Sequence, residues 1–270
     1  MHAIFGRKAF IFCGSIAFLA GRALAGQPLE TESARMLPRG AMKFEGSVEW
    51  QSSSEGQELA LPLVFDYGIS DRLELSLEPV AYTRIHPKVG ANSSGVGDFE
   101  ATLKWLAMSE SEHRPALAFG AEVKFPTAKN RQIGTGKTDF RGFVAVSRRI
   151  DQWDLHANAG YTVLGKPAGL AIDNIFDYAL AAEFHVSDRL TWLAEITGHT
   201  SATGEAPDVG PVVTVPSTSE NPLAPELAGN ETIGMVGARY LWRPGAALTL
   251  GLTYDNNNAF SIRPGVSIRW

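Results

Sequence analysis

Apolar and polar residues alternate along most of this chain from about residue 41 onward. At the C-terminus, Phe260 and Ile268 share one parity, Ser261 and Arg269 share the other, and the chain stops at Trp270. Because successive side chains of a strand point to opposite faces of a sheet, this period of two predicts a strand with one apolar and one polar face.

About twelve stretches carry this alternation, and none of them fits the 3.6-residue period of a helix. Weaker alternation at 139–150 and 230–242 leaves ten or fourteen strands open as alternatives. The predicted strands are roughly 41–51, 58–69, 72–83, 98–108, 115–126, 139–150, 152–163, 174–186, 189–199, 230–242, 246–255 and 259–270.

The connections between these stretches alternate in length. Short polar turns at 70–72, 187–189 and 243–245 contrast with long Gly-, Pro-, Ser- and Asn-rich stretches at 84–97, 127–138, 164–173 and 200–229. Short turns on one side, long loops on the other and an aromatic end are typical of transmembrane barrels. We therefore expect an all-β fold, an antiparallel transmembrane β-barrel with short periplasmic turns and long extracellular loops.

The N-terminus has the pattern of a secretory signal. Arg7 and Lys8 precede an apolar run that ends in the small-residue site Ala23-Leu24-Ala25. We predict a signal peptide over 1–25 with cleavage near Ala25, a periplasmic lead-in over 26–40 and a barrel over 41–270. Export combined with the barrel pattern predicts the bacterial outer membrane.

Composition excludes several classes of function. The only cysteine, Cys13, lies in the predicted signal peptide, so the processed chain would have no disulfide, thiol nucleophile or cysteine-ligated metal. The formal net charge is −5, and an acidic balance argues against a nucleic-acid partner. The histidines lack a zinc-type spacing. We expect no catalytic residue, no cofactor and no metal.

Charged residues gather on the polar parity, which a barrel turns toward its lumen. They either line a water-filled channel or pair across the lumen and fill it. Twelve strands lie between the filled interior of about eight and the open pore of about sixteen, so a narrow channel and one plugged by the 200–229 loop both remain open. The expected lumen-lining and solute-contacting residues are Lys43, Glu45, Glu74, Glu100, Lys104, Glu122, Lys124, His156, Asp177 and Glu183.

A hydrolase is a further alternative. His156 and Asn158 share one strand face and could lie near a serine, as in an outer-membrane phospholipase. Such a site must face lipid, whereas this pair has the lumenal parity, so the lumen-lining role is favoured.

Two kinds of partner are expected besides a small-molecule solute and membrane lipid. The last strand, with Phe260, Ile268 and Trp270, predicts a signal for the barrel-assembly machinery. Cationic loop residues could bind lipopolysaccharide phosphates, the alternative being simple solvation. These residues are Arg84, Lys88, Lys129, Arg131, Lys137 and Lys166.

A series of loop glycines and strand ends points to a known family. The motifs are Gly95-Val-Gly-Asp98 before a strand with Lys104, Phe125-Pro-Thr127, Gly134-Thr-Gly136 with Asp139, and Asn158-Ala-Gly-Tyr161. Over about 95–163 the chain resembles the outer-membrane proteins of the meta-pathway of phenol degradation family. The resemblance implies an outer-membrane barrel that takes up aromatic compounds.

The expected function is therefore an outer-membrane channel or transporter for small aromatic or hydrophobic compounds, without enzymatic activity. The leading alternative is a closed structural or surface-interaction barrel without transport. An outer-membrane lipid hydrolase is the less favoured third interpretation.

Overall fold

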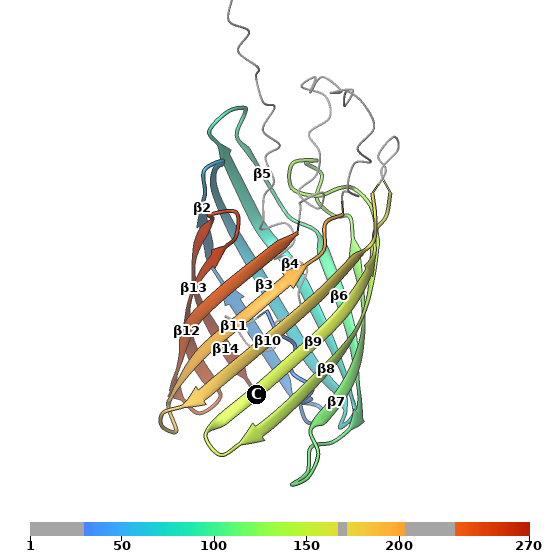
Figure 1. The fold of residues 1–270 in the computed structure, drawn as a ribbon, viewed down its shortest axis with the longest axis vertical. Coiled ribbons are helices and arrows are strands. Elements are labelled where there is room, and N and C mark those ends of the chain that lie inside the picture. Colours follow the sequence, from blue (N-terminus) through green and yellow to red (C-terminus); the bar gives the residue numbers. More distant parts are fainter. Residues whose placement is uncertain (1–29, 167–171, 203–229) are drawn as a thin grey trace, which may run out of the picture.

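The computed structural model describes residues 30–166, 172–202 and 230–270, and structural statements concern these ranges. Their strands form a single antiparallel sheet that closes into a barrel (Figure 1). The strands are β1 Met42–Ser47, β2 Glu49–Ser52, β3 Gly56–Ser70, β4 Leu73–Pro87, β5 Ser93–Gly95, β6 Phe99–Met108, β7 Ala116–Phe125, β8 Asp139–Ile150, β9 Trp153–Val163, β10 Ile175–His185, β11 Leu190–His199, β12 Glu231–Arg243, β13 Ala246–Asp255 and β14 Phe260–Arg269.

The last strand closes the barrel onto the first. β14 pairs with β13 on one side and with β1 and β2 on the other, with Arg269 opposite Lys43 and Ile262 opposite Trp50. β1 and β2 form one wall strand interrupted at Val48, and β5 pairs with β4 alone. Within the described ranges the wall therefore has twelve strands, as the alternation predicted.

One hairpin is longer than expected. β3 and β4 continue to Gly56 and Pro87, so the start of the stretch predicted as a loop, 84–97, is a strand. The register shifts between Ala60 and Pro62, because proline has no N–H to donate to the ladder. Beyond this irregularity the pairing resumes. The period of two continues through β3, whereas in β4 it is broken at Ala81 and Tyr82, which are both exposed.

Apolar side chains cover the outside of the barrel and polar ones its inside. Trp105, Phe119 and Trp192 are among the outward, exposed residues, whereas Glu45 and Thr102 are buried on the inner face. This is the reverse of a water-soluble domain, and it follows from the alternation when the outer face meets lipid. Among the described residues, no helix is long and apolar enough to cross a membrane.

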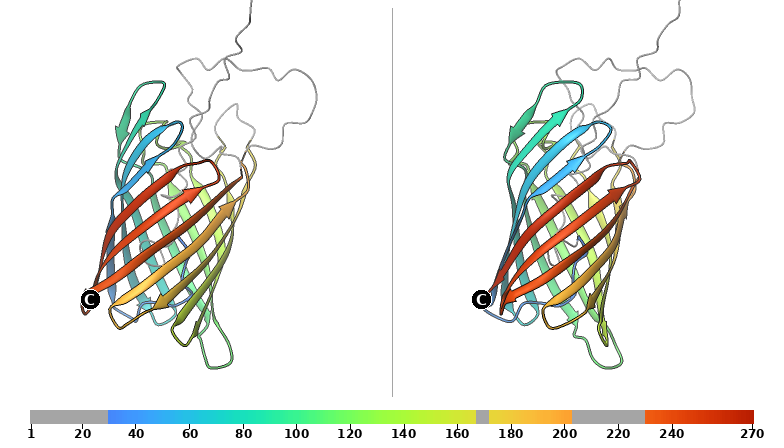
Figure 2. Two further views of the ribbon diagram at one scale, coloured as in Figure 1. Left: turned by 60° about the vertical axis from the view of Figure 1, so that its left-hand side comes forward. Right: turned by 90° about the vertical axis from the view of Figure 1, so that its left-hand side faces the viewer.

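The two ends of the barrel differ (Figure 2). At the end called here the turn end, short turns follow β3, β8 and β12, and the C-terminus lies there. At the opposite, loop end, the hairpin of β4 and β5 rises beyond its neighbours. The signal peptide and most of the 200–229 loop fall outside the described residues, so their predicted roles stay predictions.

Candidate functional site in the barrel lumen

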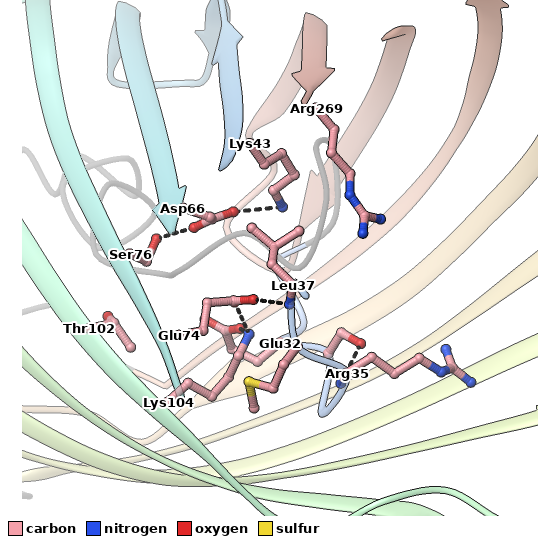
Figure 3. Close-up of a pocket in the computed structure, with 12 residues that line it drawn as sticks. Glu32, Arg35, Leu37, Lys43, Asp66, Glu74, Ser76, Thr102, Lys104 and Arg269 are labelled. Atoms are coloured by element: carbon pink, nitrogen blue, oxygen red, sulfur yellow. Dashed lines mark hydrogen bonds and ion pairs between the residues drawn. The ribbon is translucent and has the colours of Figure 1, made fainter. Parts of the chain in front are cut away.

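Residues 30–37, called here the inner segment, lie inside the barrel (Figure 3). We expected 26–40 to precede the barrel as a periplasmic lead-in; of this stretch, residues 30–37 lie within the lumen. The chain then leaves the lumen beside Gly68. A Cβ atom added to Gly68 would lie 2.2 Å from the carbonyl oxygen of Pro38, so the two backbones approach closely here. Gly40 and Ala41 then exchange backbone hydrogen bonds with Gly68 before β1 begins.

Alternate backbone N–H groups of the inner segment donate to side chains of the wall. The N–H of Glu30 donates to the Glu195 carboxylate at 2.8 Å, and that of Ala34 to the Ser147 hydroxyl at 2.8 Å. Between them, the N–H of Glu32 donates to the amide oxygen of Asn158. The wall therefore binds the backbone of the segment at every second residue, although the segment bends at Thr31 and Ala34.

The segment's two carboxylates join ion pairs that the wall already holds. Glu30 pairs with Arg263, whose Nη2 also lies 2.5 Å from Glu49. Glu32 lies 3.1 Å from the Lys104 ammonium, which is 3.0 Å from Glu74. Each cation is thus shared by one carboxylate of the wall and one of the segment. This arrangement compensates the charges of a segment that is withdrawn from bulk water.

Arg35 fastens the segment at the turn end. Its guanidinium contacts Glu110 at 2.8 Å and Asp154 at 2.7 Å. Partial burial raises the pKa of Glu110, but hydrogen bonds from the Arg149 N–H and from Arg35 outweigh it and hold the pKa below its usual range. A lowered pKa means that this contact persists at neutral pH and weakens only as acid protonates the carboxylate.

An apolar patch on the inner wall lies beneath the segment. Ala34 and Met36 pack against this lumenal patch, formed by Leu106, Ala116, Ala118, Phe143 and Ala145. The Phe143 ring lies over Gly120, where an added Cβ would be only 2.0 Å away. The Arg141 guanidinium stands 4.6 Å from the ring centroid. An aromatic and aliphatic surface is therefore present within a polar lumen.

The rest of the lumen wall is strongly acidic. Arg141 contacts Glu122 at 3.3 Å and Asp177 at 2.6 Å, and Lys124 lies 2.5 Å from Asp139. Buried carboxylates nevertheless outnumber the cationic groups of the described wall. They are Glu45, Glu49, Glu58, Asp66, Glu74, Glu78, Asp98, Glu100, Glu122, Asp139, Asp154, Asp177, Glu183, Glu195, Glu231 and Asp255, against Lys43, Lys104, Lys124, Arg141, Arg149, Arg239, Arg263 and Arg269.

The ten residues expected to line the lumen all lie on the inner face. Most of them pair with each other or with the inner segment, and a cavity of about 210 Å³ remains between Lys43, Lys104 and the segment (Figure 3). That volume is below the roughly 300–1,000 Å³ of typical ligand pockets. Contact of these residues with a solute stays a prediction.

Ser147 and His156 are hydrogen bonded at 2.8 Å, and His156 lies 3.9 Å from Glu183. This is the kind of serine neighbour that the hydrolase alternative requires. The serine, however, is fully buried, faces the lumen and accepts the Ala34 N–H. Ser147, supported by His156, therefore binds the backbone of the inner segment. No group of three or more His, Asp or Glu residues within the described ranges is arranged to hold a metal ion.

Comparison with known proteins defines the class. The barrel is similar in fold to the NanC porin, with a TM-score of 0.54, 14% identity, and coverage of 83% of this chain and 98% of that chain. It is also similar to the KdgM porin solved in complex with disordered oligogalacturonate, with a TM-score of 0.53, 10% identity, and coverage of 84% and 98%. The protein is an outer-membrane, porin-like β-barrel.

The family follows from the sequence. Residues 25–215 match the model of the family described as "Putative MetA-pathway of phenol degradation", and the chain belongs to that family. No curated protein matches it in sequence. The resemblance carried by residues 95–163 is thereby confirmed, and it extends over most of the chain.

The sequence placed Lys104, Glu74 and Asn158 on the lumenal face, but it did not identify several other residues that hold the inner segment. Ser147, Glu110 and Phe143 carry no motif, and Arg263 was visible only as one polar position in the last strand. A buried arginine on a lumenal parity predicts a carboxylate partner, which was the one available signal. That signal could not show that one of the two carboxylates bound by Arg263 belongs to Glu30 in the inner segment.

Deletion of Trp270 is expected to lower the amount of assembled barrel and to increase degradation in the periplasm. Its backbone pairs with Met42 through hydrogen bonds of 2.9 and 3.0 Å, while 64% of the residue is exposed. The side chain therefore adds little packing, and we expect it to act in recognition during assembly. Heat-modifiable mobility in gels of outer-membrane fractions measures the effect. Trp270→Phe is the control, and an unchanged barrel level after deletion would contradict the assembly role of this terminal aromatic.

Proposed function

We propose that this protein is a channel for small, neutral aromatic or hydrophobic compounds and carries out no catalysis. The observation that supports this function best is the lumenal patch around Phe143. Aromatic solutes gain free energy from an apolar, aromatic surface, whereas a lumen lined only by charges offers them nothing. Membership in the phenol degradation family supports the same solute class.

The charge of the wall refines the proposed solute. A lumen lined by excess carboxylates repels anions and attracts cations through the summed field of its walls. A neutral aromatic compound fits this surrounding better than an aromatic carboxylate does. Lipopolysaccharide remains a proposed partner of the cationic loops.

Replacing Phe143 by serine is expected to reduce the preference for aromatic solutes. The measurement is entry of a phenol-sized aromatic compound and of a small sugar into proteoliposomes. Aromatic contacts contribute about 0.5–1.5 kcal/mol, so the ratio of the two rates should fall by about 2–10-fold. The sugar should enter at least as fast, because the substitution widens the lumen.

Phe140→Leu is the matched control, since Phe140 belongs to the same strand but is 56% exposed on the outer face. The experiment is run on the full chain and on a chain whose residues 30–36 are replaced by Gly and Ser. A rate ratio that Phe143→Ser leaves unchanged would contradict the role of the patch. No entry of either solute through either chain would favour the closed structural barrel.

A further inference from the structure

The inner segment resembles a bound ligand more than a part of the barrel wall. None of residues 30–37 belongs to a strand of the sheet, and β1 begins only at Met42. Its contacts come from β4, β6, β8, β9, β11 and β14, which surround the lumen. Its alternate N–H groups donate to oxygen acceptors of the wall, and its two carboxylates pair with cationic side chains of the wall.

We propose that the lumen wall is a binding site for a short acidic peptide, and that residues 30–37 fill it as an internal ligand that obstructs the channel. The inference rests on the proposed channel function. It adds that a peptide segment of the same chain occupies the lumen when no solute passes.

The wall groups that bind the segment also bind one another, so the segment can leave without isolating them. Arg263 lies 2.5 Å from Glu49, Lys104 lies 3.0 Å from Glu74, and Ser147 lies 2.8 Å from His156, so each of these groups has a partner in the wall as well as in the segment. Withdrawal thus leaves these wall groups with partners, which avoids the large cost of an isolated buried charge. The two carboxylates of the segment would regain water.

Tethering explains how such a segment stays bound. A peptide attached to the wall through Gly40 and Ala41 has an effective concentration in the millimolar range. Contacts too weak to retain a free peptide are then sufficient. A solute that enters the lumenal patch competes with Ala34 and Met36 for the same apolar surface.

A reversible cross-link tests the site in the full chain. The hydroxyl oxygens of Ser33 and Ser147 lie 3.5 Å apart, which suits a disulfide between cysteines at these positions. Cys13 is the sole native cysteine and precedes the predicted cleavage site. The control pair is Thr253→Cys with Ser261→Cys, because these inward residues face each other across β13 and β14 without involving the segment.

Oxidation should cross-link both pairs. In planar bilayers, the oxidised Ser33→Cys/Ser147→Cys protein should conduct about tenfold less than its reduced form, a difference of about 1.4 kcal/mol. The control pair should conduct equally in both states. The chain with residues 30–36 replaced should exceed the full chain, and a synthetic peptide of residues 30–37 should reduce its current again. The same peptide with Glu30→Gln and Glu32→Gln should block less.

The outcomes separate the two proposals. A low cross-link yield at residues 33 and 147, beside a high yield in the control pair, would overturn the peptide site. So would equal currents for the locked, full and replaced chains. Absence of current in every variant, with efficient cross-linking at 33 and 147, would contradict the channel function and the obstruction while the peptide site itself stands.

Discussion

Replacing Arg263 by methionine is expected to destabilise the barrel by about 3–5 kcal/mol, the cost of leaving a buried ion pair without one partner. The Arg263 side chain is 1% exposed and holds Glu49 and Glu30 at once. Methionine keeps an unbranched apolar side chain but carries no charge, so both carboxylates would lose this cation. The loss is large beside a typical net stability of roughly 5–15 kcal/mol.

The measurement is reversible unfolding by denaturant in lipid bilayers, followed by gel mobility and tryptophan fluorescence. Arg243→Met is the matched control, because Arg243 is exposed at the turn end. Adding Glu49→Gln to Arg263→Met should recover part of the loss, since it removes one uncompensated charge. A change of less than about 1 kcal/mol, typical of a surface ion pair, would mean that water solvates this site and that the pair is not effectively buried.

Leu103→Arg is expected to cost about 2–4 kcal/mol, the penalty for a basic residue on the lipid face near mid-membrane. Leu103 lies in the middle of β6 and is 44% exposed on the outer face. Its neighbour Thr102 is 2% exposed, points inward and lies opposite Glu122. Thr102→Arg places the same charge beside carboxylates, so we expect it to fold almost normally.

Folding yield in bilayers compares the two arginine variants, and cysteine labelling checks the facing. The thiol of Leu103→Cys should react with a lipid-dissolved probe and resist an aqueous one. The thiol of Thr102→Cys should react only from water, and faster when residues 30–36 are replaced. Labelling of both positions from water alone would contradict the assignment of the outer face to lipid.

The wall of this barrel could be predicted from the local pattern, because each strand alternates between apolar residues that face lipid and polar residues that face the lumen. Leu103 and Thr102 differ in facing by one position, and the alternation around them states which face is apolar. The strand ends differ from the predicted ones by only a few residues, and the largest extension is in β4, where Ala81 and Tyr82 interrupt the period. The family, too, was recognisable from loop glycines and strand ends.

The candidate site could be predicted only in part. Charged residues such as Lys104 and Glu122 were placed on the inner face because parity alone decides the face. Which of them pair was not predictable, since Lys104 and Glu32 are far apart in the sequence. The role of Phe143 was not predictable either, because nothing in its own strand explains an apolar residue at a lumen-facing position. The explanation is the space above Gly120 on the neighbouring strand, which the Phe143 ring fills.

The strands, their two faces and the closure of the chain into a barrel could all be predicted from the amino-acid sequence, and so could the export signal, which stays a prediction. These follow from the period of two, which needs no knowledge of distant residues. The segment that fills the lumen could be recognised only in the folded barrel. Residues 30–37 have no period, and their position depends on Ser147, Glu195 and Arg263, side chains that meet around them only when the barrel has closed.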